Sequence, residues 1–381
     1  MKIVLALGLV GLSTCCFRQT QHNRQKCQGL KAKPYITSQN SQFGALIEGT
    51  SVNPSGHMFA VNFNATKSTN QLGQIFPAQK LIFTDSRPKS YLNAIRFLNP
   101  TTAFAADAAN HRILKLTVDP KTNLILNSKV FCSDPKMIQP NDIVVASTGY
   151  IFTSGMNYTT DTKSTDGDIW ACSPKGEAKR LALHGRTNGI ELSPKEDYLY
   201  VSESFNKNGA PVSQRVIKYT VDVKTGNIRA PVTFVDFGKF DNSASTDIDG
   251  MRADIYGNLF IARAGKGEVK VFNAKAKNIA TIAVSFPNPT NLEFGGPRGS
   301  TLFVVGRCKN PLAEGVEKGC VDSINLETQG AGFKRIQSAT PARRIRKEKR
   351  TKRIHKYNPT KRIHKEKRTK RIRKATTPKY N

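Results

Sequence analysis

A short sequence pattern recurs along the middle of the chain and limits its possible folds more than any other feature. Each copy starts with a side chain that carries an oxygen atom, continues as a short alternating strand and a Pro/Gly turn, and ends in a second apolar strand. Two further copies keep the strands but start differently, near residues 94 and 291. The four copies with an oxygen-bearing start begin at Glu48, Asn141, Asn188 and Asp249.

A strand-built repeat of roughly 40–50 residues is typical of a β-propeller, in which each repeat forms one blade. We therefore predict an all-β fold, a six-bladed β-propeller, over residues 41–329. Equivalent positions of the blades face one central axis, so the four oxygen-bearing side chains are expected to meet there. Asn291 is expected to line the same channel. The longest interval precedes the copy at Asp249, where residues 205–214 and 237–246 are predicted as loops over one face, and such loops often border a site.

The start of the chain has the pattern of a signal peptide. One Lys precedes an apolar run, Ile3–Leu12, which is too short to cross a bilayer as a helix. Residues 1–17 are therefore expected to direct secretion, and residues 18–40 to form a polar lead-in; a buried first strand or helix is the alternative. N-glycosylation sequons at Asn64 and Asn157 fit a secretory route. No other apolar stretch of the sequence is long enough to cross a membrane.

Cysteine usage also fits a secreted protein. None of the seven cysteines shows the CxxC spacing that a thiolate metal site would favour. Disulfides are expected instead, because secreted proteins fold in an oxidising environment. Cys308 and Cys320 flank a loop rich in Gly, Pro and Lys, and we predict that they pair. Cys132 with Cys172 is predicted as a second pair. Cys15 and Cys16 lie at the expected cleavage region of the signal peptide, so Cys27 is left without a partner.

The last part of the chain, residues 330–381, differs from the rest in composition. Residues 334–381 contain 21 Lys and Arg residues and two Glu residues, in a protein of formal net charge +31. A nine-residue repeat supplies one regular Ile per copy, which cannot build a core, so this tail is expected to be disordered. Its charge predicts an anionic partner, an acidic polysaccharide or surface rather than nucleic acid. A solvated extension without a dedicated partner is the alternative.

The side chains expected at the axis suit a hard cation. Ca²⁺ takes about six to eight oxygen ligands from carboxylates, amide carbonyls and water. Glu48 and Asp249 supply carboxylates, whereas Asn141 and Asn188 supply amide oxygens. Because this set is incomplete, water or substrate must fill the remaining positions, and a catalytic metal needs such an open position to polarise a carbonyl. A single Asn-Gly or Asp-Gly is more often a turn, but four oxygen-bearing starts in register favour a site.

Four strings, PNDIVVASTGYIF, RTNGIELSPKEDYLYVSES, DIDGMRADIYGNLFIA and PTNLEFGGPRGSTLFVV, resemble the gluconolactonase/regucalcin (senescence marker protein) family. The resemblance covers about residues 48–305. It implies a six-bladed propeller that hydrolyses sugar lactones with one divalent cation in its central channel. By resemblance, the metal ligands are Glu48, Asn188 and Asp249. The resemblance also makes Asp249 the acid/base, and it implies that Asn141 contacts substrate or completes the metal shell.

The chain departs from the family pattern at two positions. Family members often carry Arg two residues before the position of Asn141, where it holds substrate, and here that residue is Gln139. Thr50 replaces the Pro of the usual Glu-Gly-Pro. Gln139 and Asn291 are expected beside the substrate or behind the metal ligands. The departures leave the natural substrate open between a sugar-acid lactone and another lactone or ester.

Together these features predict a secreted, metal-dependent hydrolase that opens lactones, with Asp249 assisting the attack of water. The cation is expected to be Ca²⁺, with Zn²⁺, Mn²⁺ or Mg²⁺ as alternatives. A non-catalytic propeller is the competing hypothesis, because propellers serve many functions. Its axial metal would be structural, and its face or basic tail would bind a partner.

Overall fold

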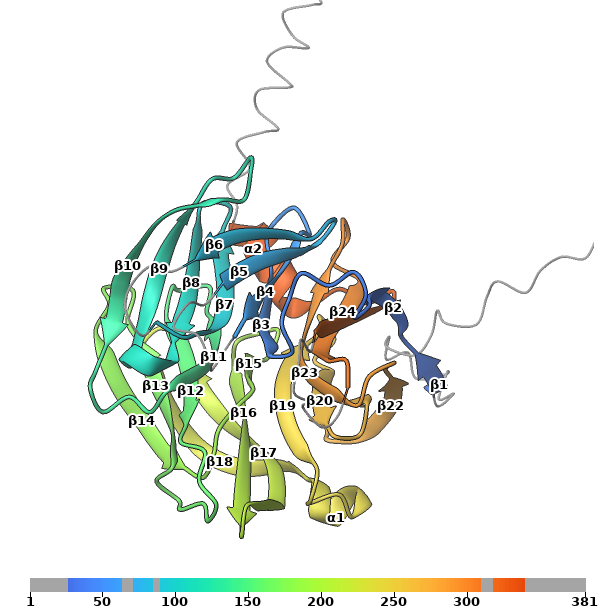
Figure 1. Cartoon of the computed structure of the whole chain (residues 1–381). Coiled ribbons are helices and arrows are strands. Elements are labelled where there is room, and N and C mark those ends of the chain that lie inside the picture. The colour runs from blue at the N-terminus through green and yellow to red at the C-terminus, as the bar shows by residue number, and fades with distance from the viewer. Residues whose placement is uncertain (1–26, 64–70, 85–89, 310–317, 340–381) are drawn as a thin grey trace, which may run out of the picture. The chain divides into compact units, whose positions relative to one another are not determined.

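The computed structural model describes residues 27–63, 71–84, 90–309 and 318–339, and these residues form six β-sheets. The innermost strands of the sheets contact one another in chain order, and the last of them contacts the first, which closes a ring (Figure 1). The predicted all-β, six-bladed propeller is thereby confirmed. The predicted signal peptide, the sequon at Asn64 and the basic tail beyond residue 339 lie outside the described residues.

The first three blades are four-stranded antiparallel sheets whose strands run from the axis outwards in chain order. Blade 1 holds β3 (Ile47–Val52), β4 (Met58–Asn62), β5 (Gln71–Phe76) and β6 (Lys80–Thr84). Blade 2 holds β7 (Leu92–Asn99), β8 (Thr102–Asp107), β9 (Arg112–Val118) and β10 (Ile125–Ser133), with a 3-10 turn at Ala108–Asn110. Blade 3 holds β11 (Pro140–Val145), β12 (Ile151–Met156), β13 (Gly167–Cys172) and β14 (Ala178–His184).

The remaining blades continue this arrangement. Blade 4 holds β15 (Ile190–Leu192), β16 (Tyr198–Lys207), β17 (Ala210–Asp222) and β18 (Asn227–Asp236). Blade 5 holds β19 (Asp247–Ala253), β20 (Leu259–Ala264), β21 (Glu268–Phe272) and β22 (Asn278–Ala283). Blade 6 holds β23 (Asn288–Gly295), β24 (Thr301–Arg307) and β25 (Gly319–Asn325). Apolar side chains join neighbouring blades; the rings of Phe260 and Phe294, for example, have centroids 5.0 Å apart.

The first described residues of the chain complete the last two blades. β1 (Cys27–Lys31) adds a parallel strand to β22, and β2 (Lys33–Ile36) pairs with β25 as the outermost strand of blade 6. Part of the predicted polar lead-in, residues 18–40, is therefore propeller. Backbone hydrogen bonds hold these edge strands, and such bonds leave little hydrophobic pattern in the sequence.

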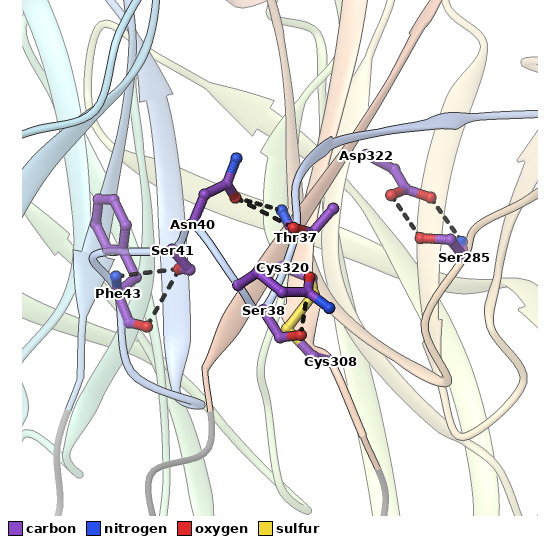
Figure 2. The surroundings of a disulfide bond; sticks show 10 residues. Thr37, Ser38, Asn40, Ser41, Phe43, Ser285, Cys308, Cys320 and Asp322 are labelled. Atoms are coloured by element: carbon purple, nitrogen blue, oxygen red, sulfur yellow. Dashed lines mark hydrogen bonds between the residues drawn. A yellow bond between two sulfur atoms is a disulfide. The ribbon is translucent and has the colours of Figure 1, made fainter.

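Both predicted disulfides are confirmed. Cys132 and Cys172 join β10 of blade 2 to β13 of blade 3. Cys308, which follows β24, pairs with Cys320 in β25. Figure 2 shows this second disulfide together with the turn after β2, in which the backbone nitrogen of Thr37 donates to the side chain of Asn40.

The two segments predicted as loops consist largely of regular elements, and only residues 242–246 remain a loop before β19. Residues 205–214 lie mostly in β16 and β17, which form a long hairpin. Its turn is the dipeptide Asn208-Gly209, whose φ angles of 51° and 76° are the positive values that a two-residue hairpin turn requires. Residues 237–246 begin with the helix α1 (Phe237–Asp241), which Asp236 caps by accepting from the backbone nitrogens of residues 238 and 239.

A second helix, α2 (Ala331–Ala339), corrects the predicted start of the tail at residue 330. Phe333 and Ile336 are buried in the core cluster shared with blades 1 and 2. The start of the tail was predicted from the change in charge. The helix was missed because two apolar side chains three residues apart are a weak helix signal in so short a segment. Neither helix of the described residues is long and apolar enough to cross a membrane.

Candidate metal and substrate site

The starts of the inner strands surround one cavity at one end of the channel. The cavity has a volume of about 440 Å³, and its lining includes all four predicted side chains: Glu48, Asn141, Asn188 and Asp249. Three of them lie on the inner strands β3, β11 and β19, and Asn188 lies just before β15. The structure therefore brings together side chains from four blades, as the repeat predicts.

Irregular strand pairing positions these side chains. In blades 1, 3 and 5, the register between the inner strand and its neighbour shifts at the start of the repeat: between Glu48 and Ser51, between Pro140 and Ile143, and between Ile248 and Met251. A bulge of this kind leaves a residue outside the regular ladder and changes the direction of its side chain. The shifts thus leave Asn141 and Asp249 outside the regular ladder, whereas Glu48 remains opposite Val61 at the edge of its shift.

The glycine that follows a starting residue allows adjacent inner strands to approach closely. A Cβ atom on Gly49 would lie 2.2 Å from the carbonyl oxygen of Asn93, on the inner strand of the next blade. A Cβ atom on Gly189 would lie 2.4 Å from the carbonyl oxygen of Asp249. The Glu-Gly and Asn-Gly dipeptides therefore serve the packing around the axis, in addition to supplying an oxygen-bearing side chain.

The two carboxylates of the cavity share an environment that favours their neutral forms. Burial raises the pKa of Glu48 to about 8, and the charge of Asp142 adds to this rise. Burial also raises the pKa of Asp249 well above its ordinary value, and the charge of Glu48 raises this pKa further. Arg307 opposes both pKa shifts. A cation bound between these two carboxyl groups would stabilise their ionised forms, so the pair is a favourable cation site.

Two buried oxygens in this cavity are candidate ligands of a cation. Oδ1 of Asn188 and Oδ1 of Asp249 are buried and have no hydrogen-bond partner among the described residues. Buried polar atoms nearly always have a partner, so these acceptors fit the ligands of a cation. Among the described residues there is no cluster of three or more His, Cys, Asp or Glu side chains that could hold a metal. The candidate set instead combines two carboxylates with amide oxygens, a hard-cation donor set.

A buried ionic network lies along the inner strands beyond the cavity. Asp142 accepts from Nη2 of Arg96 at 2.9 Å and lies 3.2 Å from Nη1 of Arg252. Arg252 is fully buried, and its Nε also lies 3.0 Å from a carboxylate oxygen of Glu293. Its Nη2 donates to Oδ1 of Asn291 at 2.9 Å. This network pairs opposite charges from blades 2, 3, 5 and 6 and forms a rigid floor for the cavity.

Helix α2 lies at the other end of the inner strands. Nε of Arg335 lies 2.7 Å from a carboxylate oxygen of Glu196, and its Nη2 lies 4.0 Å from Glu191. Arg335 and Ile336 line a small cavity of about 20 Å³ with residues from the later part of the inner strands, such as Val145. The channel therefore has an open end with the four starting residues and an end that α2 covers.

Two further predicted positions lie apart from the cavity lining. Asn291 is buried in the network, where Oδ1 also accepts from Thr50 and its amide hydrogen-bonds to Glu48. Asn291 thus holds the candidate metal ligand Glu48 through a hydrogen bond from outside the cavity lining. Gln139 is exposed, and its Nε2 donates to Oδ1 of Asn157 at 3.3 Å. Gln139 is not among the lining residues.

Side chains that the repeat did not mark form much of the cavity wall. Arg186 donates from Nη2 to Asp247 at 2.8 Å, and its guanidinium lies 4.5 Å from the ring centroid of Tyr158. Arg307, the last residue of β24, lines the cavity as well. These residues lie outside the repeated starting positions, so a pattern based on repetition gives them no signal.

Comparisons with known proteins agree with this architecture. A family model described as "SMP-30/Gluconolactonase/LRE-like region" matches residues 131–306. These residues belong to that family. The SMP-30/gluconolactonase region spans blades 3 to 5 and much of blade 6, and it includes Asn141, Asn188 and Asp249 but not Glu48.

Two curated proteins are similar to parts of the chain. A gluconolactonase of Zymomonas mobilis is 26% identical over 224 residues, which are 53% of this chain and 56% of that protein. An uncharacterized protein of Sulfolobus acidocaldarius is 28% identical over 148 residues, 39% of this chain and 50% of that protein. The chain thus spans about half the length of the curated relatives that it matches.

A solved structure shares the fold. Regucalcin of Agrobacterium tumefaciens, described as a calcium-binding protein, superposes with a TM-score of 0.61 at 17% identity. The superposition covers 79% of this chain and 97% of that protein. At this identity the likeness establishes the propeller fold alone.

Proposed function

We propose that the protein is a hydrolase that opens lactones with the help of one divalent cation held by Glu48, Asn188 and Asp249. The observation that carries the proposal is the pair of buried oxygens of Asn188 and Asp249 that find no hydrogen-bond partner within the described part of the chain, beside Glu48 at the open end of the channel. The similarity to a gluconolactonase supports the reaction type. The cavity of about 440 Å³ is of a size that accepts a small ring compound.

The oxygen donors favour Ca²⁺, with Zn²⁺, Mn²⁺ or Mg²⁺ as alternatives. A bound divalent cation would polarise the lactone carbonyl and lower the pKa of water. Glu48, Asn188 and Asp249 would hold it, supported by Asn291 behind Glu48 and by the ionic floor. Asn141, which also lines the cavity, is placed to contact the substrate or complete the cation's shell.

Asp249 is the proposed acid/base. A carboxylate that holds the cation through one oxygen keeps its second oxygen to accept a proton from the attacking water. The water oxygen bonds to the carbonyl carbon, the bond from that carbon to the ring oxygen breaks, and the proton passes to the ring oxygen. The product is a hydroxy acid.

A lactone panel tests this proposal. Gluconolactone and larger lactones are offered to the calcium-loaded protein, with and without chelator, and acid release is followed at constant pH. We expect chelation to abolish hydrolysis and Asp249→Asn to reduce kcat at least about 100-fold, the typical contribution of a general base. Glu327→Gln, at an exposed carboxylate outside the cavity, is the matched control. Equal rates for wild type, Asp249→Asn and Glu48→Gln would support the non-catalytic propeller instead.

We also propose that the chain is secreted and that its basic tail adheres to anionic polysaccharide. The apolar run Ile3–Leu12, the two disulfides and the charge of residues 334–381 support this proposal. Electrostatic binding of this kind weakens steeply with salt. Removal of residues 341–381 should abolish retention on heparin at low ionic strength, and unchanged retention would contradict adhesion through the tail.

A further inference from the structure

The cavity contains unpartnered donors as well as unpartnered acceptors. Asn288 and Arg307 are directly opposite each other in β23 and β24, and both line the cavity. Opposite residues of an antiparallel pair present their side chains on the same face of the sheet. Nδ2 of Asn288 and Nε of Arg307 are buried, and neither has a hydrogen-bond partner among the described residues. Two neighbouring donors therefore lack an acceptor.

Arg307 also differs from the other arginines of the channel in its charge balance. Arg96 is paired with Asp142 at 2.9 Å, and Arg186 is paired with Asp247 at 2.8 Å. For Arg307, no ion pair occurs within the described part of the chain. Arg307 is half-buried, and Glu48 and Asp249, whose charges it acts on, are the residues proposed to hold the cation, so a ligand can supply the opposite charge.

A metal held by Glu48 and Asp249, on the two blades that flank blade 6, would add positive charge beside Arg307. The ionisable side chains of the lining are three carboxylates, Glu48, Asp247 and Asp249, and two guanidinium groups, Arg186 and Arg307. With these side chains ionised and a divalent cation bound at Glu48 and Asp249, the lining carries a net positive charge of one. The metal-loaded cavity is then complementary to an anion.

We propose that Asn288 and Arg307 form a subsite for a carboxylate, so that the substrate is a lactone that carries a carboxylate group in addition to its ester carbonyl. This inference rests on the proposed lactonase function. The planar guanidinium favours a carboxylate over a hydroxyl group, because its parallel N–H groups match two oxygens and add charge. The subsite lies on blade 6, between the blades that supply Glu48 and Asp249, so a carboxylate held there orients the lactone beside the proposed cation.

A matched pair of lactones tests the subsite. One is γ-butyrolactone, and the other carries a carboxylate on the ring carbon next to the ring oxygen. Wild-type, calcium-loaded, full-length protein should prefer the carboxylate-bearing lactone. In Arg307→Gln the ratio of kcat/KM for the charged and neutral lactones should fall about 10- to 100-fold, the usual range for one hydrogen bond to a charged group. Arg307→Lys, which keeps the charge but loses the two parallel N–H donors of the guanidinium, should give an intermediate ratio.

Arg229→Gln is the matched control, because Arg229 is exposed on β18 and outside the cavity lining. It should leave the ratio unchanged. An unchanged ratio in Arg307→Gln, with a melting temperature close to that of wild type, would overturn the subsite.

A second measurement separates failure of the subsite from failure of the proposed function. Tetrahydrofuran-2-carboxylate has the same ring and carboxylate but no ester to hydrolyse, and its binding to the calcium-loaded protein is measured by calorimetry. We expect Kd to rise at least ten-fold in Arg307→Gln. If wild type hydrolyses neither lactone but shows this Arg307-dependent binding, the lactonase proposal fails and the carboxylate subsite stands. Equal binding by wild type and Arg307→Gln overturns the subsite, whatever the hydrolysis rates.

Discussion

Replacement of Glu48 by Gln should change how the stability of the metal-free protein depends on pH. Burial raises the pKa of Glu48 to about 8 from an ordinary value of 4.5. Between these values the folded protein keeps a proton that the unfolded chain releases, so the free energy of unfolding falls as the pH rises. A rise of this size in the pKa corresponds to about 5 kcal/mol. Glu48 is partly exposed to the cavity, and water there screens part of this effect, so we expect about 2 kcal/mol.

The assay is urea unfolding of the disulfide-intact, full-length protein in chelator at pH 5 and pH 8. Between these values wild type should lose about 2 kcal/mol more free energy of unfolding than Glu48→Gln, which has no carboxyl group to ionise. Glu327→Gln, at an exposed position, should behave as wild type does. If wild type and Glu48→Gln lose the same free energy of unfolding between the two pH values, the inferred environment of Glu48 is wrong.

Three other predictions follow from the site and its supports. Calcium binding at pH 7 should release protons, because the pKa of Glu48 is about 8 in the metal-free protein; calorimetry in two buffers of different ionisation enthalpy would then give different apparent enthalpies, and equal values would contradict the prediction. Gly189→Ala should weaken calcium binding at least about ten-fold in a titration, since a Cβ there would lie 2.4 Å from the carbonyl oxygen of Asp249, whereas Gly332→Ala, with open space around it, should not. Phe333→Ala should lower the free energy of unfolding by about 3 kcal/mol through loss of core packing, while removal of residues 341–381 should leave it unchanged in the same denaturation assay.

The repeat made the blades and the convergence of their starting residues predictable. Alternating apolar residues mark half-buried strands, and equivalent positions of successive blades must face the same axis. Glu48 and Asp249 could thus be placed in one cavity without a structure. The Asn208-Gly209 turn was also readable, since Asn-Gly between alternating residues is a hairpin signal. Its interpretation as part of a loop missed the extended strands on either side.

Other features depend on contacts that no local pattern records. β1 and β2 are held by backbone bonds to β22 and β25, about 250 residues or more along the chain. Arg307 and Asn288 meet because of the register between two strands, and Arg252 pairs with carboxylates from two other blades. Each of these side chains looks like an ordinary surface residue in sequence, because its role depends on which distant groups surround it.

The use of β2 as the outermost strand of blade 6 has a consequence for the order of folding. During synthesis β2 leaves the ribosome early, but its partner β25 is among the last strands to appear. Blades 1 to 4 can form as the chain emerges, whereas blade 6 must wait for both ends. Glu48 and Asp249, on either side of blade 6, are held together only once that blade is complete. Cation binding should therefore report completion of the chain, and a nascent propeller without β25 is expected to lack it.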